Sequence, residues 1–144
     1  MDNKVAEIFM FDLRVTYADC TLGNHVYYGR YLDFLEAARG EFHREIGFPL
    51  LSLQEQDTIF PVIQCSIKYL KPARYDDVLQ IRLWLSKLSQ VRLTFEYEIL
   101  REEQVLLKAI TDHVCTSVND KPKRIPEQLA AKFSKYLQLS ITPT

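Results

Sequence analysis

The chain has 144 residues, the length of one domain, and its 47% hydrophobic and 26% charged residues exclude an intrinsically disordered protein. Its 18 basic and 19 acidic residues give a net charge of −1 without a basic tail or stripe, which excludes the electrostatic footprint of nucleic-acid binding. No apolar run approaches a membrane span, and the first residues lack the apolar stretch of a signal peptide. We therefore expect a single globular domain over residues 1–144 that binds no nucleic acid and spans no membrane.

The three cysteines, Cys20, Cys65 and Cys115, form an odd set without CxxC spacing. Such a set argues against a disulfide framework and favours the cytoplasm, where thiols stay reduced. Cys115 shares a face of an expected strand with His113, but two ligands without a third do not make a metal site. The sequence therefore predicts a cytoplasmic protein without a bound metal.

The first expected element is a strand over residues 6–17, which are rich in β-forming side chains. Residues 18–24 then form a turn, whose last two residues, Gly23 and Asn24, suit a tight turn or a helix N-cap. The chain has only 4 glycines, whereas average usage predicts about ten for this length. All 4 fall between residues 23 and 47. This concentration makes residues 23–47 the first place to look for chemistry.

A long helix is expected from about residue 25 to 46, because apolar side chains recur there at spacings of three and four. At 1.5 Å per residue, about 22 residues would span about 33 Å and would need a broad sheet to cover them. Gly47 and Pro49 are expected to end this helix. Gly29 and Gly40 fall on the opposite stripe, where we expect a partner subunit or the substrate to approach closely. The apolar stripe consists of Tyr27, Tyr31, Phe34, Leu35, Ala38, Phe42 and Ile46.

The remaining elements are four strands and a short helix. The strands are expected at residues 59–70, 78–87, 91–99 and 105–118. The short links 88–90 and 102–104 predict antiparallel hairpins, because parallel neighbours need crossovers of a dozen residues or more. Pro126 is expected to start the final helix. This order predicts an α+β fold in which the long helix lies on one face of an antiparallel sheet of about five strands.

Three motifs in the sequence resemble those of a known family. They are YADCTLGNHVYYGRYLDFLEAAR at residues 17–39, KPARYDDVL at 71–79 and KRIPEQL at 123–129. All three are similar to segments of the 4-hydroxybenzoyl-CoA thioesterase family, in the same order and over nearly the whole chain. The resemblance implies the hot-dog fold, in which a curved antiparallel sheet wraps a long central helix and a short helix ends the chain. It also implies hydrolysis of an acyl-CoA thioester to the free acid and CoA, with no cofactor beyond the CoA of the substrate.

The resemblance further implies where catalysis takes place. In this family, backbone N–H groups at the start of the central helix polarise the substrate carbonyl, since the first turn has no intrahelical acceptors for them. The matching amides belong to residues 26–28, with Tyr28 as the expected donor. The family also carries Asp-x-Asp before this helix, and the second carboxylate acts as base or nucleophile. Here the run is Asp19-Cys20-Thr21, so Thr21 occupies the position of that carboxylate.

The group that replaces this carboxylate stays open. Asp19 is one candidate, directly or through a water held by Thr21, although an aspartate in a turn also suits backbone capping. His25 is the other, because an imidazole suits proton transfer near neutral pH. Glu36 and Glu41 on the helix are more distant alternatives, and the Cys20 thiol is a less favoured nucleophile.

Candidate substrate-binding residues lie near the helix start or carry positive charge that suits the phosphates of CoA. They are Asn24, Tyr27, Glu36, Arg74, Lys87 and Arg92, with Lys68 and Lys71 as further cations. Asn24 alternatively caps the helix, Tyr27 alternatively belongs to the apolar stripe, and each cation alternatively is an ordinary solvated charge. The 17 aromatic residues, seven of them between Tyr17 and Phe48, favour an apolar or aromatic acyl group.

The resemblance also bears on partners and on competing functions. Hot-dog subunits form dimers with a continuous sheet, and many dimers pair again, so we expect a homodimer or homotetramer. The long strand at 105–118 supports this expectation, because its edge would otherwise be exposed. Two alternatives to an acyl-CoA thioesterase remain. One is a thioesterase for acyl groups on an acyl carrier protein, and the other is an acyl-CoA-binding protein that Thr21 has left catalytically impaired.

Overall fold

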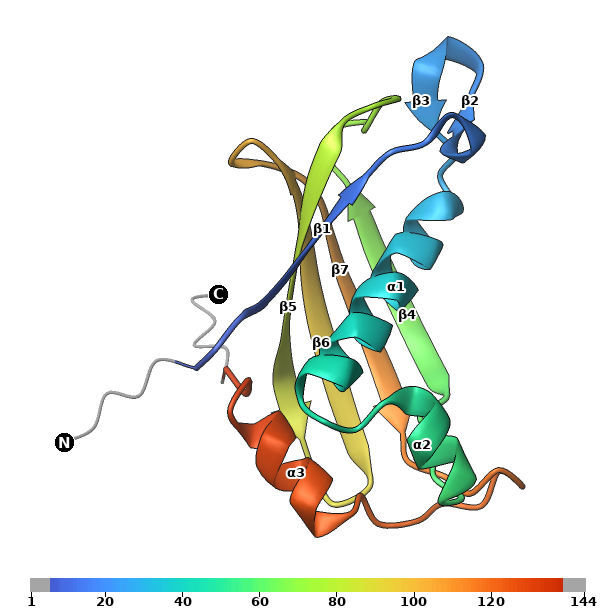
Figure 1. Cartoon of the computed structure of the whole chain (residues 1–144), viewed down its shortest axis with the longest axis vertical. Coiled ribbons are helices and arrows are strands. Elements are labelled where there is room, and N and C mark those ends of the chain that lie inside the picture. The colour runs from blue at the N-terminus through green and yellow to red at the C-terminus, as the bar shows by residue number, and fades with distance from the viewer. Residues whose placement is uncertain (1–5, 139–144) are drawn as a thin grey trace, which may run out of the picture.

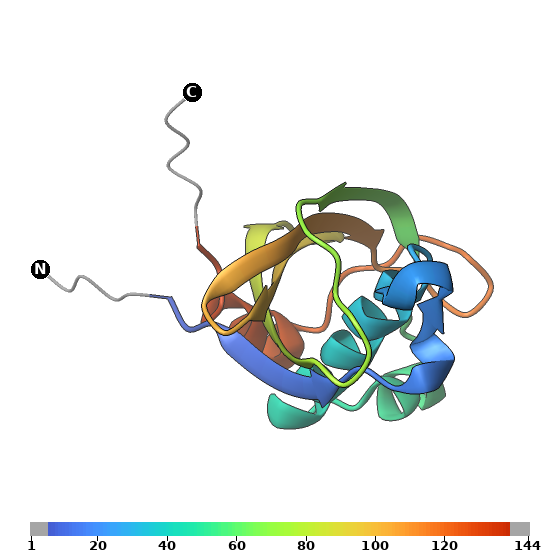
Figure 2. The same ribbon diagram turned by 90° about the horizontal axis from the view of Figure 1, so that it is seen from above.

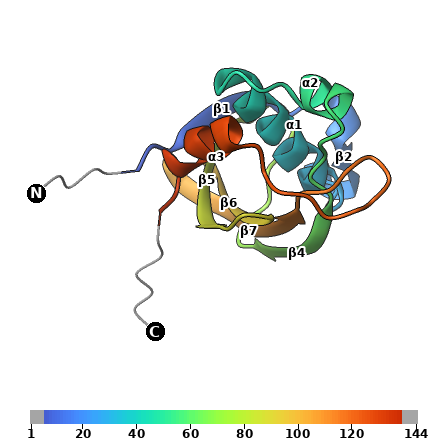
Figure 3. The ribbon, with the colours of Figure 1, turned by 90° about the horizontal axis from the view of Figure 1, so that it is seen from below.

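Five strands form one antiparallel sheet in the computed structural model, which describes residues 6–138. In their order across the sheet they are β1 (Phe9–Arg14), β5 (Val78–Leu88), β6 (Arg92–Arg101), β7 (Gln104–Val114) and β4 (Val62–Tyr69). Figure 1 shows the long helix α1 (Arg30–Glu45) lying along one face of this sheet. The sheet curves around α1 in the two end views (Figures 2 and 3). The predicted α+β class is confirmed.

The inner face of the sheet forms the core, as the alternating sequence predicts. Every second residue of β5 and β6 points towards α1 and is almost completely buried, because period-two alternation places these side chains on one face. They are Leu79, Ile81, Leu83, Leu85, Leu93, Phe95, Tyr97 and Ile99. From α1, the Phe42 ring packs edge-on at 5.7 Å from Phe95. This packing fixes the helix on the sheet.

The final helix, α3 (Glu127–Ser134), begins after Pro126 as predicted. Its Leu129 and Phe133 side chains are fully buried. The Phe133 ring stacks at 6.2 Å from Phe42, so α3 closes the core beside the carboxyl end of α1 (Figure 1).

The predicted start of the long helix was wrong by five residues. Residues 20–26 form a small ribbon of two short strands, β2 (Cys20–Thr21) and β3 (His25–Val26). Its turn has positive φ at Gly23 (78°) and Asn24 (60°), and the ribbon includes His25 and Val26, which were expected in the helix. Helix α1 is therefore 16 residues long, about 24 Å rather than about 33 Å.

The later helix start changes the interpretation of two residues. Tyr27 lies before α1 and is half exposed, so it does not belong to the apolar stripe. Gly29 is the N-cap rather than an interior residue, and a Cβ there would lie 2.9 Å from the Tyr27 ring. At Gly40, a Cβ would meet only Arg44 Nη1, at 3.9 Å. The close neighbour of Gly29 is thus the chain itself.

A second helix was not predicted. Gly47 ends α1 with φ of 86°, as expected, but Pro49 then caps a further short helix, α2 (Leu50–Glu55). Proline suits this position because its fixed φ is compatible with a helix start and its missing N–H is not needed there. Pro49 therefore separates two helices instead of leading into a loop.

The edge strands of the sheet are β1 and β4, not the strand at 105–118 as predicted. Strand β7 lies inside the sheet, because β6 and β4 pair with it on either side. Strand β4 pairs on one side only, and seven of its 8 residues are exposed. Figure 1 shows β4 beside α1 with nothing beyond it. An edge strand with unpaired N–H and C=O groups is a template for pairing with another chain.

Candidate active site

Two backbone amides at the start of α1 are free to bind a ligand. The N–H of Tyr27 donates to Asp19 O (2.9 Å), and the N–H of Arg30 donates to Tyr27 O (2.8 Å). Between them, the N–H groups of Tyr28 and Gly29 reach no acceptor within residues 6–138. The first turn of a helix leaves such donors unpaired, and the helix dipole adds positive potential there. The arrangement suits a negatively charged oxygen.

A groove of about 300 Å³ lies at the start of α1, and Tyr28, but not Gly29, is among the residues that line it. Its walls come from the β3 ribbon, the start of α1 and the loop that follows β4. The lining residues are His25, Val26, Tyr28, Tyr31, Tyr69, Leu70, Lys71 and Pro72. The groove is therefore mostly aromatic and apolar, with one imidazole and one ammonium group at its edge.

Tyr69 orients the free amide of Gly29. Its hydroxyl donates to Tyr28 O at 2.9 Å, and this carbonyl belongs to the same peptide plane as the Gly29 N–H. The chain contains no cis peptide bond in its described part, so the carbonyl and the N–H of this plane point in opposite directions. Burial raises the pKa of Tyr69, which keeps the phenol protonated as a donor. A residue of β4 thus holds the peptide between Tyr28 and Gly29, with the Gly29 N–H pointing away from the Tyr69 hydroxyl.

Tyr31 connects the same region to the next loop. Its hydroxyl accepts a hydrogen bond from the N–H of Ala73 at 3.0 Å, and its ring packs edge-on at 5.5 Å from Tyr69. Burial raises the pKa of Tyr31 as well. Sequence reasoning assigned Tyr31 to the core and missed Tyr69 altogether, because both contacts join residues about 40 positions apart.

The Asp19 carboxylate is engaged in holding the backbone. Oδ2 accepts from the N–H of Thr16 (2.8 Å) and from its hydroxyl (3.0 Å), and Oδ1 lies 3.5 Å from Arg30 Nε. The side chain is only 13% exposed. These contacts form a capping box and tie the turn to the first residue of α1. Asp19 therefore supports the position of the free amides.

Thr21 and His25 face each other. They form a direct cross-strand pair between β2 and β3, so their side chains lie on the same face of the ribbon. The other pair, Cys20 and Val26, points towards the protein, and Val26 is buried. Both Thr21 and His25 are exposed, and His25 also lines the groove.

Asn24 and Arg74 serve the backbone near the groove. Asn24 Oδ1 accepts from the N–H of Tyr75 at 3.1 Å, so it does not cap α1. Arg74 Nη1 donates to Gly23 O at 3.4 Å. Both contacts hold the β2–β3 turn against the loop after β4.

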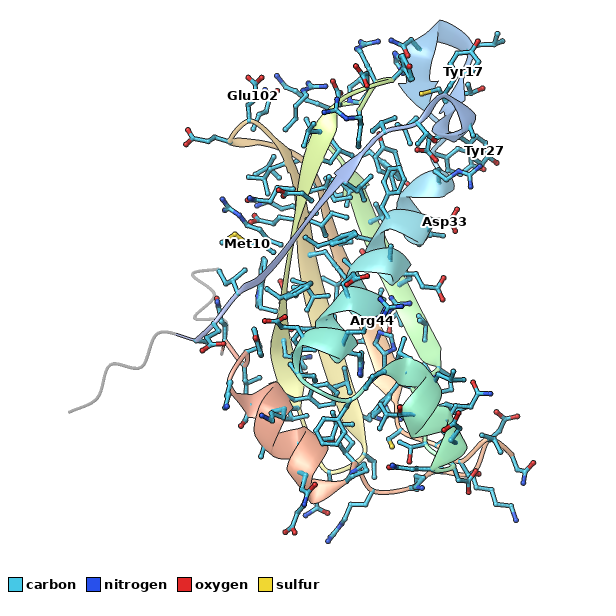
Figure 4. All side chains as sticks on the ribbon, in the orientation of Figure 1. Met10, Tyr17, Tyr27, Asp33, Arg44 and Glu102 are labelled. Carbon is cyan, nitrogen blue, oxygen red and sulfur yellow. The ribbon has the colours of Figure 1, made fainter. Side chains whose placement is uncertain are left out.

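Tyr27 and Glu36 also lie on the α1 side of this region. The Tyr27 ring packs 4.8 Å from that of Tyr28, and Figure 4 shows Tyr27 at this end of the molecule. A hydrogen bond and charge interaction with Tyr28 raise the pKa of Tyr27. Glu36 lies further along α1, exposed to solvent.

The structure separates Lys87 and Arg92 from the other predicted residues. Both line a second groove of about 350 Å³ at the β5–β6 hairpin, together with Ile63 and Gln64 at the start of β4. In Figure 1 this hairpin and the first residues of α1 lie at opposite ends of the sheet. Within one chain these two cations are therefore remote from the free amides.

Among residues 6–138, no group of three His, Cys, Asp or Glu side chains is placed to hold a metal ion. No helix in this part of the chain has the length and apolar character needed to cross a membrane.

A curved antiparallel sheet around a central helix, with free amides at the helix start, defines a hot-dog protein of the thioesterase class. The family described as "Thioesterase-like superfamily" matches residues 15–133, and the chain belongs to this family.

Known relatives agree. An acyl-CoA thioesterase named YbgC from Haemophilus influenzae is 34% identical, over 87% of this chain and 93% of its own. The crystal structure of a probable thioesterase from Bartonella henselae superimposes with a TM-score of 0.80 at 33% identity, covering 83% of this chain and 100% of the other. A 1,4-dihydroxy-2-naphthoyl-CoA thioesterase from Synechocystis superimposes with a TM-score of 0.82 at 25% identity, over 89% and 96% of the two chains.

Proposed function

We propose that the protein hydrolyses an acyl-CoA thioester to the free acid and CoA at the start of α1, working as one domain in the cytoplasm. The observation that carries this proposal is the pair of free N–H groups of Tyr28 and Gly29 at the start of α1, where Tyr28 lines an aromatic groove. Relatives named acyl-CoA thioesterases support it. The three free thiols of the chain agree with a reducing compartment.

The two amides stabilise the transition state. The thioester carbonyl oxygen accepts hydrogen bonds from Tyr28 and Gly29, and these bonds strengthen as negative charge develops on the oxygen. One such donor contributes about 10²- to 10³-fold in rate. Because Tyr69 already orients the Gly29 peptide, little reorganisation is needed when the substrate arrives.

His25 takes the proton of the attacking water. Its imidazole lines the groove and faces Thr21, whose hydroxyl helps to hold the water. The water oxygen forms a bond to the carbonyl carbon, the C–S bond breaks, and the proton passes to the CoA sulfur. Asp19 supports the backbone of this site, since its carboxylate is occupied by Thr16 and Arg30.

The working form is a homodimer in which β4 pairs with β4 of a second copy. Antiparallel pairing places the start of one β4 beside the end of the other. The groove of Lys87 and Arg92 adjoins the start of β4, and the groove beside the amides adjoins its end. Lys87 and Arg92 of the partner subunit thereby come close to the thioester site and bind CoA phosphates, while Lys71 and Arg74 supply charge from the same chain.

A second function is an acyl-CoA-binding protein without turnover, which the missing carboxylate at Thr21 favours. Steady-state hydrolysis of short, long-chain and aromatic acyl-CoA thioesters, with matched acyl groups on an acyl carrier protein, separates the possibilities. We expect turnover of at least one acyl-CoA. Tight binding with hydrolysis no faster than the uncatalysed rate would assign the protein to the binding function, and turnover of carrier-bound substrates alone would change the donor.

The two cations are tested with truncated substrates. We expect the variant Lys87→Ala/Arg92→Ala to have a higher KM for acyl-CoA but an unchanged KM for the same acyl group on N-acetylcysteamine, which lacks the nucleotide. An equal effect on both thioesters would contradict the assignment of these residues to CoA.

A further inference from the structure

A chain of four hydrogen bonds crosses the inner face of the sheet beneath α1. Arg39 Nη1 lies 3.0 Å from the hydroxyl of Tyr97, which lies 2.7 Å from the hydroxyl of Thr111. Thr111 Oγ1 lies 2.8 Å from His113 Nε2, and His113 Nδ1 lies 2.9 Å from Phe60 O. This series of hydrogen bonds links α1, β6, β7 and the segment before β4.

With a neutral imidazole at His113, the two ends of this series of hydrogen bonds fix the direction of every bond in it. A guanidinium only donates and a carbonyl oxygen only accepts. Tyr97 therefore donates to Thr111, Thr111 donates to His113 Nε2, and the Nδ1–H of His113 donates to Phe60. This arrangement requires a neutral imidazole and a protonated phenol. Burial lowers the pKa of His113 to about 4 and raises the pKa of Tyr97, in agreement.

The Arg39 guanidinium lacks an anionic partner in the described chain. No carboxylate oxygen of residues 6–138 lies within 4.0 Å of it, whereas Arg30, Arg44 and Arg101 each have one. Arg39 is partly buried, so its charge is incompletely hydrated. Of its five N–H donors, one is held by Tyr97. A fixed, partly desolvated cation of this kind is well prepared to bind an anion.

Arg39 lies at a defined distance from the free amides. Along α1, Gly29 and Arg39 are ten residues apart, which corresponds to about 15 Å. The guanidinium lies at the level of Cys65 on β4, because it binds the hydroxyl of Tyr97, which in turn binds Thr111, the cross-strand partner of Cys65. Cys65 and Tyr69 share the inner face of β4, four residues or about 13 Å apart. Tyr69 binds the peptide at the start of α1, so the distance along β4 and the distance along α1 give a similar separation between Arg39 and the free amides.

The strip of surface between Arg39 and the free amides is exposed to solvent. On β4 the inner-face residues Cys65 and Tyr69 are exposed, and Ile67 between them is only partly covered. On α1 the side chain of Leu32 is also half exposed. An extended acyl chain that starts at the amides and follows this strip reaches Arg39 with its far end.

We propose that Arg39 determines acyl specificity by binding a carboxylate at the far end of the acyl group, so that the preferred substrates are CoA monothioesters of dicarboxylic acids. This inference rests on the proposed thioesterase function. A carboxylate matches the planar donors of a guanidinium in two parallel hydrogen bonds. The bound anion also neutralises a charge that the described chain leaves uncompensated.

Binding is tested separately from turnover with S-alkyl-CoA thioethers, which cannot be hydrolysed. Each is made with and without a terminal carboxylate over a series of chain lengths, and titrated calorimetrically into wild type, Arg39→Met and Arg44→Met. Arg44 is the matched control, because it lies on α1, pairs with Glu41 at 2.6 Å and has a side chain that is 63% exposed. We expect the carboxylate to tighten binding by about 10- to 100-fold at one chain length in wild type and in Arg44→Met. In Arg39→Met this gain disappears.

The hydrogen bond between Arg39 and the Tyr97 hydroxyl provides a second test variant. Tyr97→Phe keeps the Arg39 charge but removes the hydroxyl that holds it, so we expect a gain from the carboxylate that is smaller than in wild type. The absence of any carboxylate preference in wild type would overturn the proposal, even when plain acyl-CoA thioesters are hydrolysed. Loss of dimer in Arg39→Met by analytical ultracentrifugation, with the carboxylate preference intact, would also overturn it, because Arg39 would then bind a carboxylate of the second copy. If no thioester is hydrolysed, the proposed function fails, and this outcome is distinct from the loss of the carboxylate preference.

Discussion

Thr21 and His25 lie directly opposite each other in the β2–β3 ribbon, on the face turned away from the buried Val26. Three residues separate them in the sequence, and the left-handed backbone of Gly23 and Asn24 brings them together. The position where the family resemblance places a carboxylate is thereby next to an imidazole that lines the groove.

This pairing predicts the behaviour of two substitutions. His25→Ala is expected to lower kcat by about 10²- to 10⁴-fold, because it removes the general base. Thr21→Asp in the same background is expected to recover part of the loss, since the new carboxylate faces the same side of the ribbon. Steady-state kinetics with one acyl-CoA measure both effects. An unchanged kcat in His25→Ala would remove His25 from the mechanism.

Asp19 gives a contrasting prediction. Asp19→Asn is expected to keep kcat within several-fold, because its amide oxygen still accepts from the N–H of Thr16. Asp19→Ala loses this cap and is expected to lower the free energy of unfolding by about 1 kcal/mol. Urea unfolding and kinetics on the same samples check both. A folded Asp19→Asn protein without activity would identify Asp19 as the working carboxylate.

Two buried histidines predict a pH dependence of stability. Burial lowers the pKa of both His43 and His113 to about 4. The unfolded chain binds their protons from pH ~6.5 downwards, while the folded chain does not until about pH 4. Stability is therefore complete above pH ~6.5 and falls by about 3 kcal/mol per histidine as the pH drops to 4.

The variant His43→Phe isolates one of these contributions. Its ring still packs against Phe42 and Phe133, but it does not titrate. We expect the free energy of unfolding, measured in urea from about pH 8 to about pH 4, to fall less steeply in His43→Phe than in wild type. Parallel pH profiles would show that His43 is not buried in its neutral form.

Gly40 predicts a gain in stability. It lies inside α1, and a Cβ there makes only an ordinary contact with Arg44. Gly40→Ala is expected to raise the free energy of unfolding by about 0.5–1 kcal/mol, because glycine loses more backbone entropy in a helix. Chemical denaturation measures this gain, and activity should be unchanged. A loss of stability would mean that a second molecule packs against Gly40.

The sheet was largely predictable from the sequence, and its edges were not. Residues 91–99 alternate so regularly that β6 and its two hairpins follow from local pattern. Which strand lies at the edge depends on pairing between distant segments, and β4 pairs with β7 some 40 residues later. The helix start was missed because His25 and Val26 pair with Thr21 and Cys20 in the ribbon, and the spacing of apolar residues does not reveal this pairing.

The site was predictable only where its residues are neighbours in sequence. Tyr28 and His25 follow from the motif around the start of α1. Tyr69 and Arg39 do not, because their roles depend on contacts across 41 and 58 residues, Tyr69 with Tyr28 and Arg39 with Tyr97. Lys87 and Arg92 lie near the expected site only when a second chain is added.

Gly29 offers a direct test of the central claim, that free amides at the start of α1 polarise the thioester. Its φ of −73° is compatible with proline, and Gly29→Pro removes the N–H. Gly29→Ala is the matched control, because its Cβ meets the same Tyr27 ring at 2.9 Å while the N–H remains. Thermal unfolding of both variants checks that α1 still forms.

The decisive measurement is the ratio of kcat between Gly29→Ala and Gly29→Pro with the best acyl-CoA substrate. We predict that Gly29→Pro is slower by about 10²- to 10³-fold, the contribution of one oxyanion donor. Equal kcat values in two folded variants would contradict the assignment of the Gly29 amide to catalysis.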